Sequence, residues 1–82
     1  MWNKGIWSKG TIETAEGIRV DYDVKHYGEG SDFGIDGGKI SKLEMTVNGE
    51  IVAHYERGWD IRPDKDNKNI MTVYREILKK YN

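Results

Sequence analysis

The sequence predicts an α+β fold, in which a four-stranded antiparallel sheet of two hairpins carries one C-terminal helix on its apolar face. Apolar and polar residues alternate over residues 18–26, as in a half-buried strand. A second alternating segment, residues 40–57, contains an Asn-Gly pair that is typical of hairpin turns. Apolar residues recur at helical spacing over residues 70–81, which predicts an amphipathic helix.

Length and composition bound the class of protein. The 82 residues suit a single domain, residues 1–82, with a thin core and no cysteine to cross-link it. Thirteen basic and fourteen acidic residues give a net charge of −1, which argues against strong sequence-independent binding of nucleic acid. Residues 1–14 contain no long apolar run, so we expect neither a signal peptide nor a membrane-spanning helix and place the protein in the cytoplasm.

The first hairpin is expected to turn at residues 15–17, because Gly17 can take the positive φ that ends a three-residue loop. This loop pairs Thr14 with Ile18 and fixes the register of both strands. Apolar residues then meet on one face and opposite charges on the other. The expected cross-strand pairs are Ile12 with Val20 and Gly10 with Tyr22 inside, and Glu13 with Arg19 and Lys9 with Asp23 outside.

The second hairpin turns around Asn48-Gly49, and two registers compete. A two-residue turn would place Leu43 opposite His54 and mix apolar with polar residues. A three-residue loop over residues 47–49 keeps the apolar residues on one side, so we expect the loop. The expected pairs are Met45 with Ile51, Leu43 with Ala53 and Ser41 with Tyr55, which leaves Lys42, Glu44 and His54 on the polar face.

The C-terminal segment predicts a helix that begins soon after Pro63, a residue that cannot donate a hydrogen bond within a sheet. Asp64, Asp66 and Asn67 are candidate N-caps. We expect the helix to dock through its apolar face, which comprises Ile70, Val73, Tyr74, Ile77, Leu78 and Tyr81.

Between the hairpins lies a glycine-rich connection, residues 28–38, with two interpretations. In the first it is a binding loop whose acidic side chains or backbone N–H groups meet a ligand. In the second it is a compact connector, with Phe33 and Ile35 covering the edge of the sheet. Its spacing fits neither a phosphate-binding loop nor a calcium loop.

Three tryptophans add candidate contact residues. Trp59 could anchor an interface or pack beneath the helix. Trp7, with Trp2, either forms an exposed apolar patch or is covered by the N-terminal segment. The predicted partner-binding residues are Trp7, Glu29, Asp32, Phe33, Asp36, Trp59 and Asp60.

Catalysis is the minority interpretation. His26 and His54 are the only histidines, and no cysteine or serine nucleophile motif accompanies them. We therefore predict no catalytic residue, no cofactor and no metal site.

The segment of residues 33–43, which begins Phe33-Gly34-Ile35-Asp36-Gly37-Gly38, and the later Arg57-Gly58-Trp59-Asp60 resemble an uncharacterised family of small proteins from low-GC Gram-positive bacteria and their phages. The similarity spans roughly the second half of the chain, and Lys39 stands where the family often has arginine. The resemblance implies a setting, that of a phage or mobile-element accessory protein inside a bacterium. It carries no activity, cofactor or site residue to this chain.

The expected function is therefore that of a non-enzymatic accessory protein that binds a partner and inhibits a host factor. The partner is a host protein or a small ligand, and a homodimer is also considered. The alternative is a small nucleic-acid-binding module that uses a basic stripe on the helix, formed by Lys68, Arg75 and Lys79. The near-neutral charge of the chain ranks this alternative second.

Overall fold

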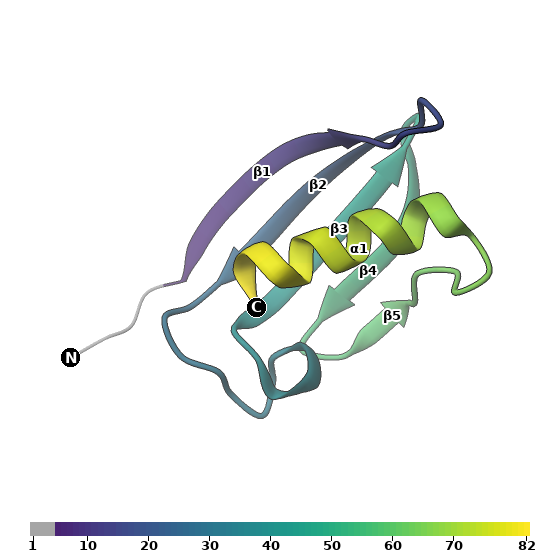
Figure 1. Ribbon diagram of the computed structural model, residues 1–82. Helices are drawn as coiled ribbons and strands as arrows, with labels where there is room; N and C mark the ends of the chain where they lie inside the picture. Colours follow the sequence, from purple (N-terminus) through teal and green to yellow (C-terminus); the bar gives the residue numbers. More distant parts are fainter. Residues whose placement is uncertain (1–4) are drawn as a thin grey trace.

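The computed structural model of the protein describes residues 5–82. Within these residues one antiparallel sheet has the strand order β1-β2-β3-β4-β5, and a single α-helix lies across one of its faces (Figure 1). The α+β class with a C-terminal helix is confirmed. The elements are β1 (Ile6–Glu13), β2 (Arg19–His26), the 3₁₀ turn η1 (Ile35–Gly37), β3 (Ile40–Val47), β4 (Glu50–Glu56), β5 (Trp59–Ile61) and α1 (Lys68–Tyr81).

The sheet has five strands, so the expectation of four was wrong. After β4 the chain turns at Arg57, which has a φ of 58°, and the N–H of Glu56 donates to the carbonyl of Gly58 at 2.9 Å. This turn pairs Tyr55 with Trp59 and starts β5. At three residues β5 is too short to show a period of two, which is why the sequence pattern did not predict it.

The first hairpin has the predicted register. The N–H of Thr14 donates to the carbonyl of Ile18 at 2.8 Å, and Gly17 has a φ of 84°. All four predicted cross-strand pairs occur, including Lys9 with Asp23. The turn residues of this hairpin and the alternation of its strands were therefore sufficient to predict the register of both strands.

The second hairpin differs from its prediction. It is a two-residue turn in which Asn48 and Gly49 have φ values of 52° and 81°, the two positive angles that a type I′ turn requires. The register then shifts between Thr46 and Met45, where Val52 stands as the extra residue of β4. The bulge shifts the register by one residue. The apolar residues therefore lie on one face although the turn has two residues rather than the expected three. The observed inner pairs are Met45 with Ala53 and Leu43 with Tyr55, and Ile51 is exposed.

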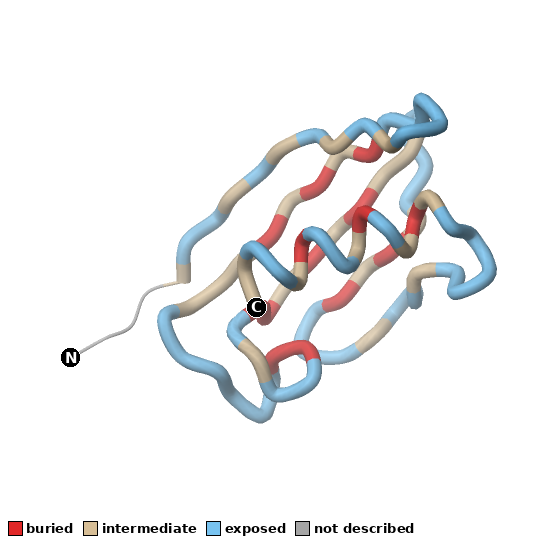
Figure 2. The backbone as a smooth tube through the Cα atoms, in the orientation of Figure 1, coloured by how far each residue is buried: buried red, intermediate tan, exposed pale blue. Residues whose placement is uncertain are grey.

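The core lies between α1 and the face of the sheet that we call the inner face; the opposite face is the outer face. Figure 2 shows buried positions alternating along the central strands and recurring along α1. Asn67 caps the helix, because its side-chain oxygen accepts from the N–H groups of Asn69 and Ile70. The buried core comprises Val20, Tyr22, Val24, Ile35, Ile40, Leu43, Met45, Ala53, Tyr55, Ile70, Val73 and Ile77.

The glycine-rich connection folds into a compact structure at one end of the sheet. Ile35 enters the core, whereas Phe33, which the connector interpretation also expected to cover the sheet edge, is 58% exposed. Asn82 holds the connection from the end of α1, donating from Nδ2 to the carbonyl of Ile35 and accepting from the N–H of Ile40. The hydroxyl of Tyr55 donates to the carbonyl of Phe33 at 2.8 Å.

A candidate binding hollow on the outer face of the sheet

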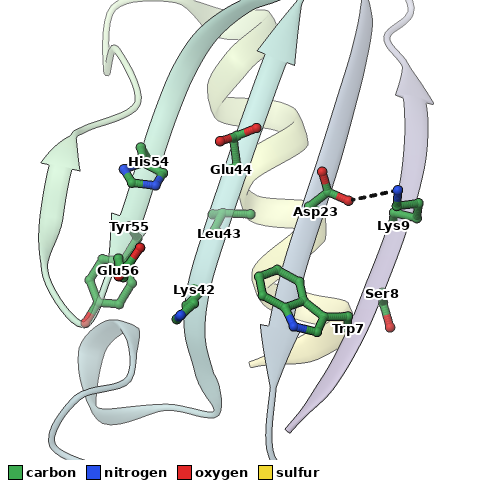
Figure 3. A pocket seen from close by; sticks show the side chains of 10 residues that line it. All are labelled: Trp7, Ser8, Lys9, Asp23, Lys42, Leu43, Glu44, His54, Tyr55 and Glu56. Carbon is green, nitrogen blue, oxygen red and sulfur yellow. Dashed lines mark ion pairs between the residues drawn. The ribbon is translucent and has the colours of Figure 1, made fainter.

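The outer face carries a hollow of about 460 Å³ (Figure 3). It lies across β1 to β4, on the side of the sheet that α1 leaves open. Because alternate side chains of each strand point to this face, four strands contribute to one surface. The lining residues whose side chains belong to the outer face are Trp7, Lys9, Asp23, Lys42, Glu44, His54 and Glu56. Ser8, Leu43 and Tyr55, which alternate with them along the strands and belong to the inner face, also border the hollow.

Trp7 is the largest side chain at the hollow. The register of the first hairpin places it opposite Lys25, and it is 58% exposed. The ammonium of Lys25 stands 5.9 Å from the centre of the indole ring, within the range of a cation–π contact. The indole therefore lies on an open sheet face, where a partner can cover it.

Between β2 and β3 the charges of the outer face are arranged with like opposite like, whereas between β3 and β4 Lys42 lies opposite Glu56. The register of β2 and β3 places Lys25 opposite Lys42 and Asp23 opposite Glu44. Like charges in directly opposed positions destabilise a sheet. Lys9 forms an ion pair with Asp23 at an N–O distance of 3.7 Å, which offsets the repulsion between Asp23 and Glu44. Among residues 5–82 no ion pair forms at Lys42 or Glu44. These two opposite charges can therefore pair with groups of a partner.

His54 lines the hollow with its ring fixed in place. Its Nδ1 lies 2.9 Å from a carboxylate oxygen of Asp60 in β5. A carboxylate on one ring nitrogen orients an imidazole and leaves the other nitrogen to contact solvent or a ligand. The short strand β5 thus brings Asp60, a predicted partner-binding residue, to the edge of the hollow.

The domain of a known protein family covers the same residues as the fold. A family model described as a domain of unknown function, DUF7678, matches residues 6–82. The chain belongs to the DUF7678 family. No curated protein and no solved structure matches the chain.

The structure separates the predicted partner-binding residues of this DUF7678 domain into three places. Trp7 and Asp60 lie at the outer face. Trp59 lies on the inner side, half-buried, with its ring 4.9 Å from Tyr55 and 5.8 Å from Tyr74. Exposed side chains of the glycine-rich connection make up the third group: Glu29, Asp32, Phe33 and Asp36. Trp2 lies outside the described residues.

The basic stripe of the DUF7678 domain is exposed along α1. Lys68, Arg75 and Lys79 lie on the helix that covers the inner face, so they and the hollow belong to opposite sides of the sheet. No helix within residues 5–82 is long and apolar enough to cross a membrane.

A polar cluster that the sequence did not predict joins the sheet to the end of α1. Ser8 Oγ lies 3.0 Å from His26 Nε2, and the imidazole packs 4.8 Å from the ring of Tyr81. Tyr81 in turn shares a hydrogen bond of 2.9 Å with Tyr22. Burial, this hydrogen bond and the charge of the second phenol raise the pKa of Tyr22 to about 12.

Sequence reasoning also missed the hollow itself. The alternation of β3 and β4 correctly placed Lys42, Glu44 and His54 on the polar face. Their meeting with Trp7 depends on the pairing of β2 with β3 across a long connection, which no local turn signal specifies.

Proposed function

We propose that this DUF7678 domain is a non-enzymatic binding module that takes a protein partner on the outer face of its sheet. The observation that carries the proposal is Trp7, which is 58% exposed above a hollow of about 460 Å³. Tryptophan is enriched among the residues that dominate the affinity of protein interfaces. Large exposed apolar groups beside a hollow are typical of interaction sites.

The polar groups of the hollow support a protein rather than a purely apolar ligand. Lys42 and Glu44 offer opposite charges side by side, which an extended partner segment with acidic and basic side chains can match. His54, held by Asp60, adds a ring nitrogen at the rim. In this arrangement Trp7 supplies apolar contact area, and the charged residues select the partner.

The setting of the proposal comes from the resemblance given above. That resemblance supports a phage or mobile-element protein of a low-GC Gram-positive bacterium, and the absence of cysteine suits the reducing cytoplasm. In that setting the module acts by occupying a surface of a host protein and so inhibiting it. A small ligand in the hollow is the alternative occupant of the same site.

A second candidate function rests on the exposed stripe of Lys68, Arg75 and Lys79 along α1. Such a stripe can contact phosphates, and its affinity would fall steeply with salt. It ranks second because Glu76 lies on the same helix and the chain is close to neutral.

The experiment is site-specific crosslinking from the outer face. A photoreactive aromatic amino acid, which keeps a large apolar ring at the position, replaces Trp7 in one variant and Phe33 in another, since both side chains are 58% exposed but lie on different surfaces. After irradiation in a nuclease-treated bacterial lysate, we expect the position-7 variant to form one defined protein adduct and the position-33 variant to form none. Adducts at position 33 alone would move the site to the glycine-rich connection. A third variant, with the photoreactive amino acid at position 79, that forms an adduct only in untreated lysate while position 7 is silent would favour the basic stripe.

The glycine-rich connection provides a further arm of the same experiment. Asp32→Ala with Asp36→Ala removes two exposed carboxylates from that surface. We expect the position-7 adduct to persist in this background, and its loss would assign the connection a share in binding. The matched double variant for the outer face is Lys42→Ala with Glu44→Ala, which we expect to weaken the adduct.

A further inference from the structure

We propose that β1 pairs antiparallel with β1 of a second copy of this chain, which joins the two five-stranded sheets into one. The inference goes beyond the proposed function, because it uses the edge of the sheet rather than its outer face.

The two edges of the sheet are unequal. The edge strand β5 has three residues and is followed closely by Pro63, two features that discourage pairing with another strand. The other edge strand, β1, has eight residues, and its free side has no strand neighbour among the described residues. Proteins usually shorten, twist or cover an edge of this length. An edge left long on one side only is suited to a partner strand.

The register of the first hairpin shows which backbone groups of β1 are free. Thr14 donates to Ile18 at 2.8 Å, so even-numbered residues of β1 direct their hydrogen-bonding groups toward β2. The N–H and C=O groups of the odd-numbered residues therefore point away from the sheet, at the free edge. These residues are Trp7, Lys9, Thr11 and Glu13.

Charge selects one register for the pair. With the two-fold axis at Thr11, Lys9 of each copy lies opposite Glu13 of the other, so two ion pairs form. With the axis at Lys9, two ammonium groups would meet. With the axis at Gly10, Lys9 would lie opposite Thr11 and Trp7 opposite Glu13, and no ion pair would form. Only the first register is complementary in charge.

The same register also places the other residues of β1 in favourable positions. Trp7 lies opposite Ala15 in the hairpin loop of the second copy, and Ile12 lies opposite Gly10. Because odd-numbered side chains of both copies share the outer face, the two hollows open on the same side of the joined sheet. A strand pair alone buries little surface, and interfaces below about 1,200 Å² are usually weak and reversible. We therefore expect a dimer that dissociates on dilution.

A charge swap tests the register. Lys9→Glu and Glu13→Lys are each expected to weaken dimerisation at least about tenfold, as measured by sedimentation equilibrium over a range of concentrations. The double variant, Lys9→Glu with Glu13→Lys, recreates both intermolecular pairs and should restore dimerisation. Within one copy, the acidic residue at position 9 lies opposite Asp23 and the basic residue at position 13 lies opposite Arg19. Both contacts join like charges, so the double variant restores no ion pair within the monomer. Recovery therefore reports only on the contact between copies.

Thr11→Pro tests the backbone contact. It removes an N–H that points to the free edge, and proline is tolerated in edge strands at such positions. We expect a folded monomer at every concentration. Lys65→Glu, a charge change at an exposed position between β5 and α1, away from the edge, is the control and should leave the equilibrium unchanged. A wild-type protein that stays monomeric, or a dimer that neither Lys9→Glu nor Glu13→Lys weakens, would overturn the proposal. If Thr11→Pro fails to fold, the charge swap decides alone.

Discussion

Gly10 lies opposite Tyr22 on the inner face, and the bare backbone at Gly10 makes room for the Tyr22 phenol to lie over β1. A Cβ at position 10 would stand 2.7 Å from the Tyr22 hydroxyl oxygen. From this position the hydroxyl reaches Tyr81 at 2.9 Å and ties the edge hairpin to the end of α1. One glycine thus allows a contact between residues 59 positions apart.

Gly10→Ala should therefore destabilise the fold. The added methyl group must push the Tyr22 ring away from Tyr81, and overpacking of this kind costs about 1–3 kcal/mol. Urea denaturation measures the free energy of unfolding. Gly58→Ala is the control, because a Cβ at position 58 meets no atom within 4 Å, and it should change stability little. Equal effects of the two substitutions would contradict this account of Gly10.

The raised pKa of Tyr22 predicts a pH dependence. Between pH 10 and about 12 the folded protein keeps the Tyr22 proton while the unfolded chain releases it. The unfolded state then binds fewer protons, so the free energy of unfolding falls as the pH rises through this window. Tyr22→Phe should make that fall shallower and lower stability near neutral pH by about 1 kcal/mol for the lost hydrogen bond. Identical slopes for the two proteins in denaturation series above pH 10 would refute the shift.

The two hairpin turns require glycine for backbone reasons alone. Gly17 and Gly49 have φ values of 84° and 81°, and a Cβ at either position meets no atom within 4 Å. Gly17→Val and Gly49→Val should each destabilise the fold by ~1–2 kcal/mol, because a side chain disfavours left-handed backbone. Thermal unfolding of each variant beside the parent measures the effect. If either variant melts with the parent, its turn does not depend on glycine.

The hairpins show how far local sequence determines this fold. In the first, the three-residue loop and the alternation led to every observed pair. In the second, the apolar residues lie on one face of the sheet, as predicted. The bulge at Val52 places them there, whereas a three-residue loop was expected to do so. A bulge has no composition signal of its own, and a type I′ turn followed by a bulge shifts the register as a loop residue would.

Long-range contacts account for the rest of what the sequence could not predict. Asn82 clamps Ile35 and Ile40 across more than forty positions, as hydrogen bonds with sequence separations of 47 and 42 show. The hollow depends in the same way on β2 and β3 meeting in one register. The candidate residues Trp7 and Asp60 were found from residue type, whereas Lys42, Glu44 and His54 could be assigned to a site only once the strands were paired.

The clamp at Asn82 predicts a graded mutational series. Asn82→Ala removes both side-chain hydrogen bonds and leaves the N–H of Ile40 without its partner, which should cost about 1–3 kcal/mol. Asn82→Asp keeps an acceptor for Ile40 but loses the donor to Ile35, so its loss should be smaller. Lys80→Ala, at an exposed position of the same helix, is the control. Chemical denaturation should rank the three in that order, and any other ranking would argue against the clamp.

The central claim is that Trp7 anchors a protein partner on the outer face. Once crosslinking has identified that partner, the most direct test is the dissociation constant of the purified pair, measured by titration calorimetry for the parent and for Trp7→Ala. The account predicts that Trp7→Ala loses at least about 2 kcal/mol of binding free energy, roughly thirtyfold in Kd, while its melting temperature stays close to that of the parent. An unchanged Kd for a folded Trp7→Ala variant would contradict it.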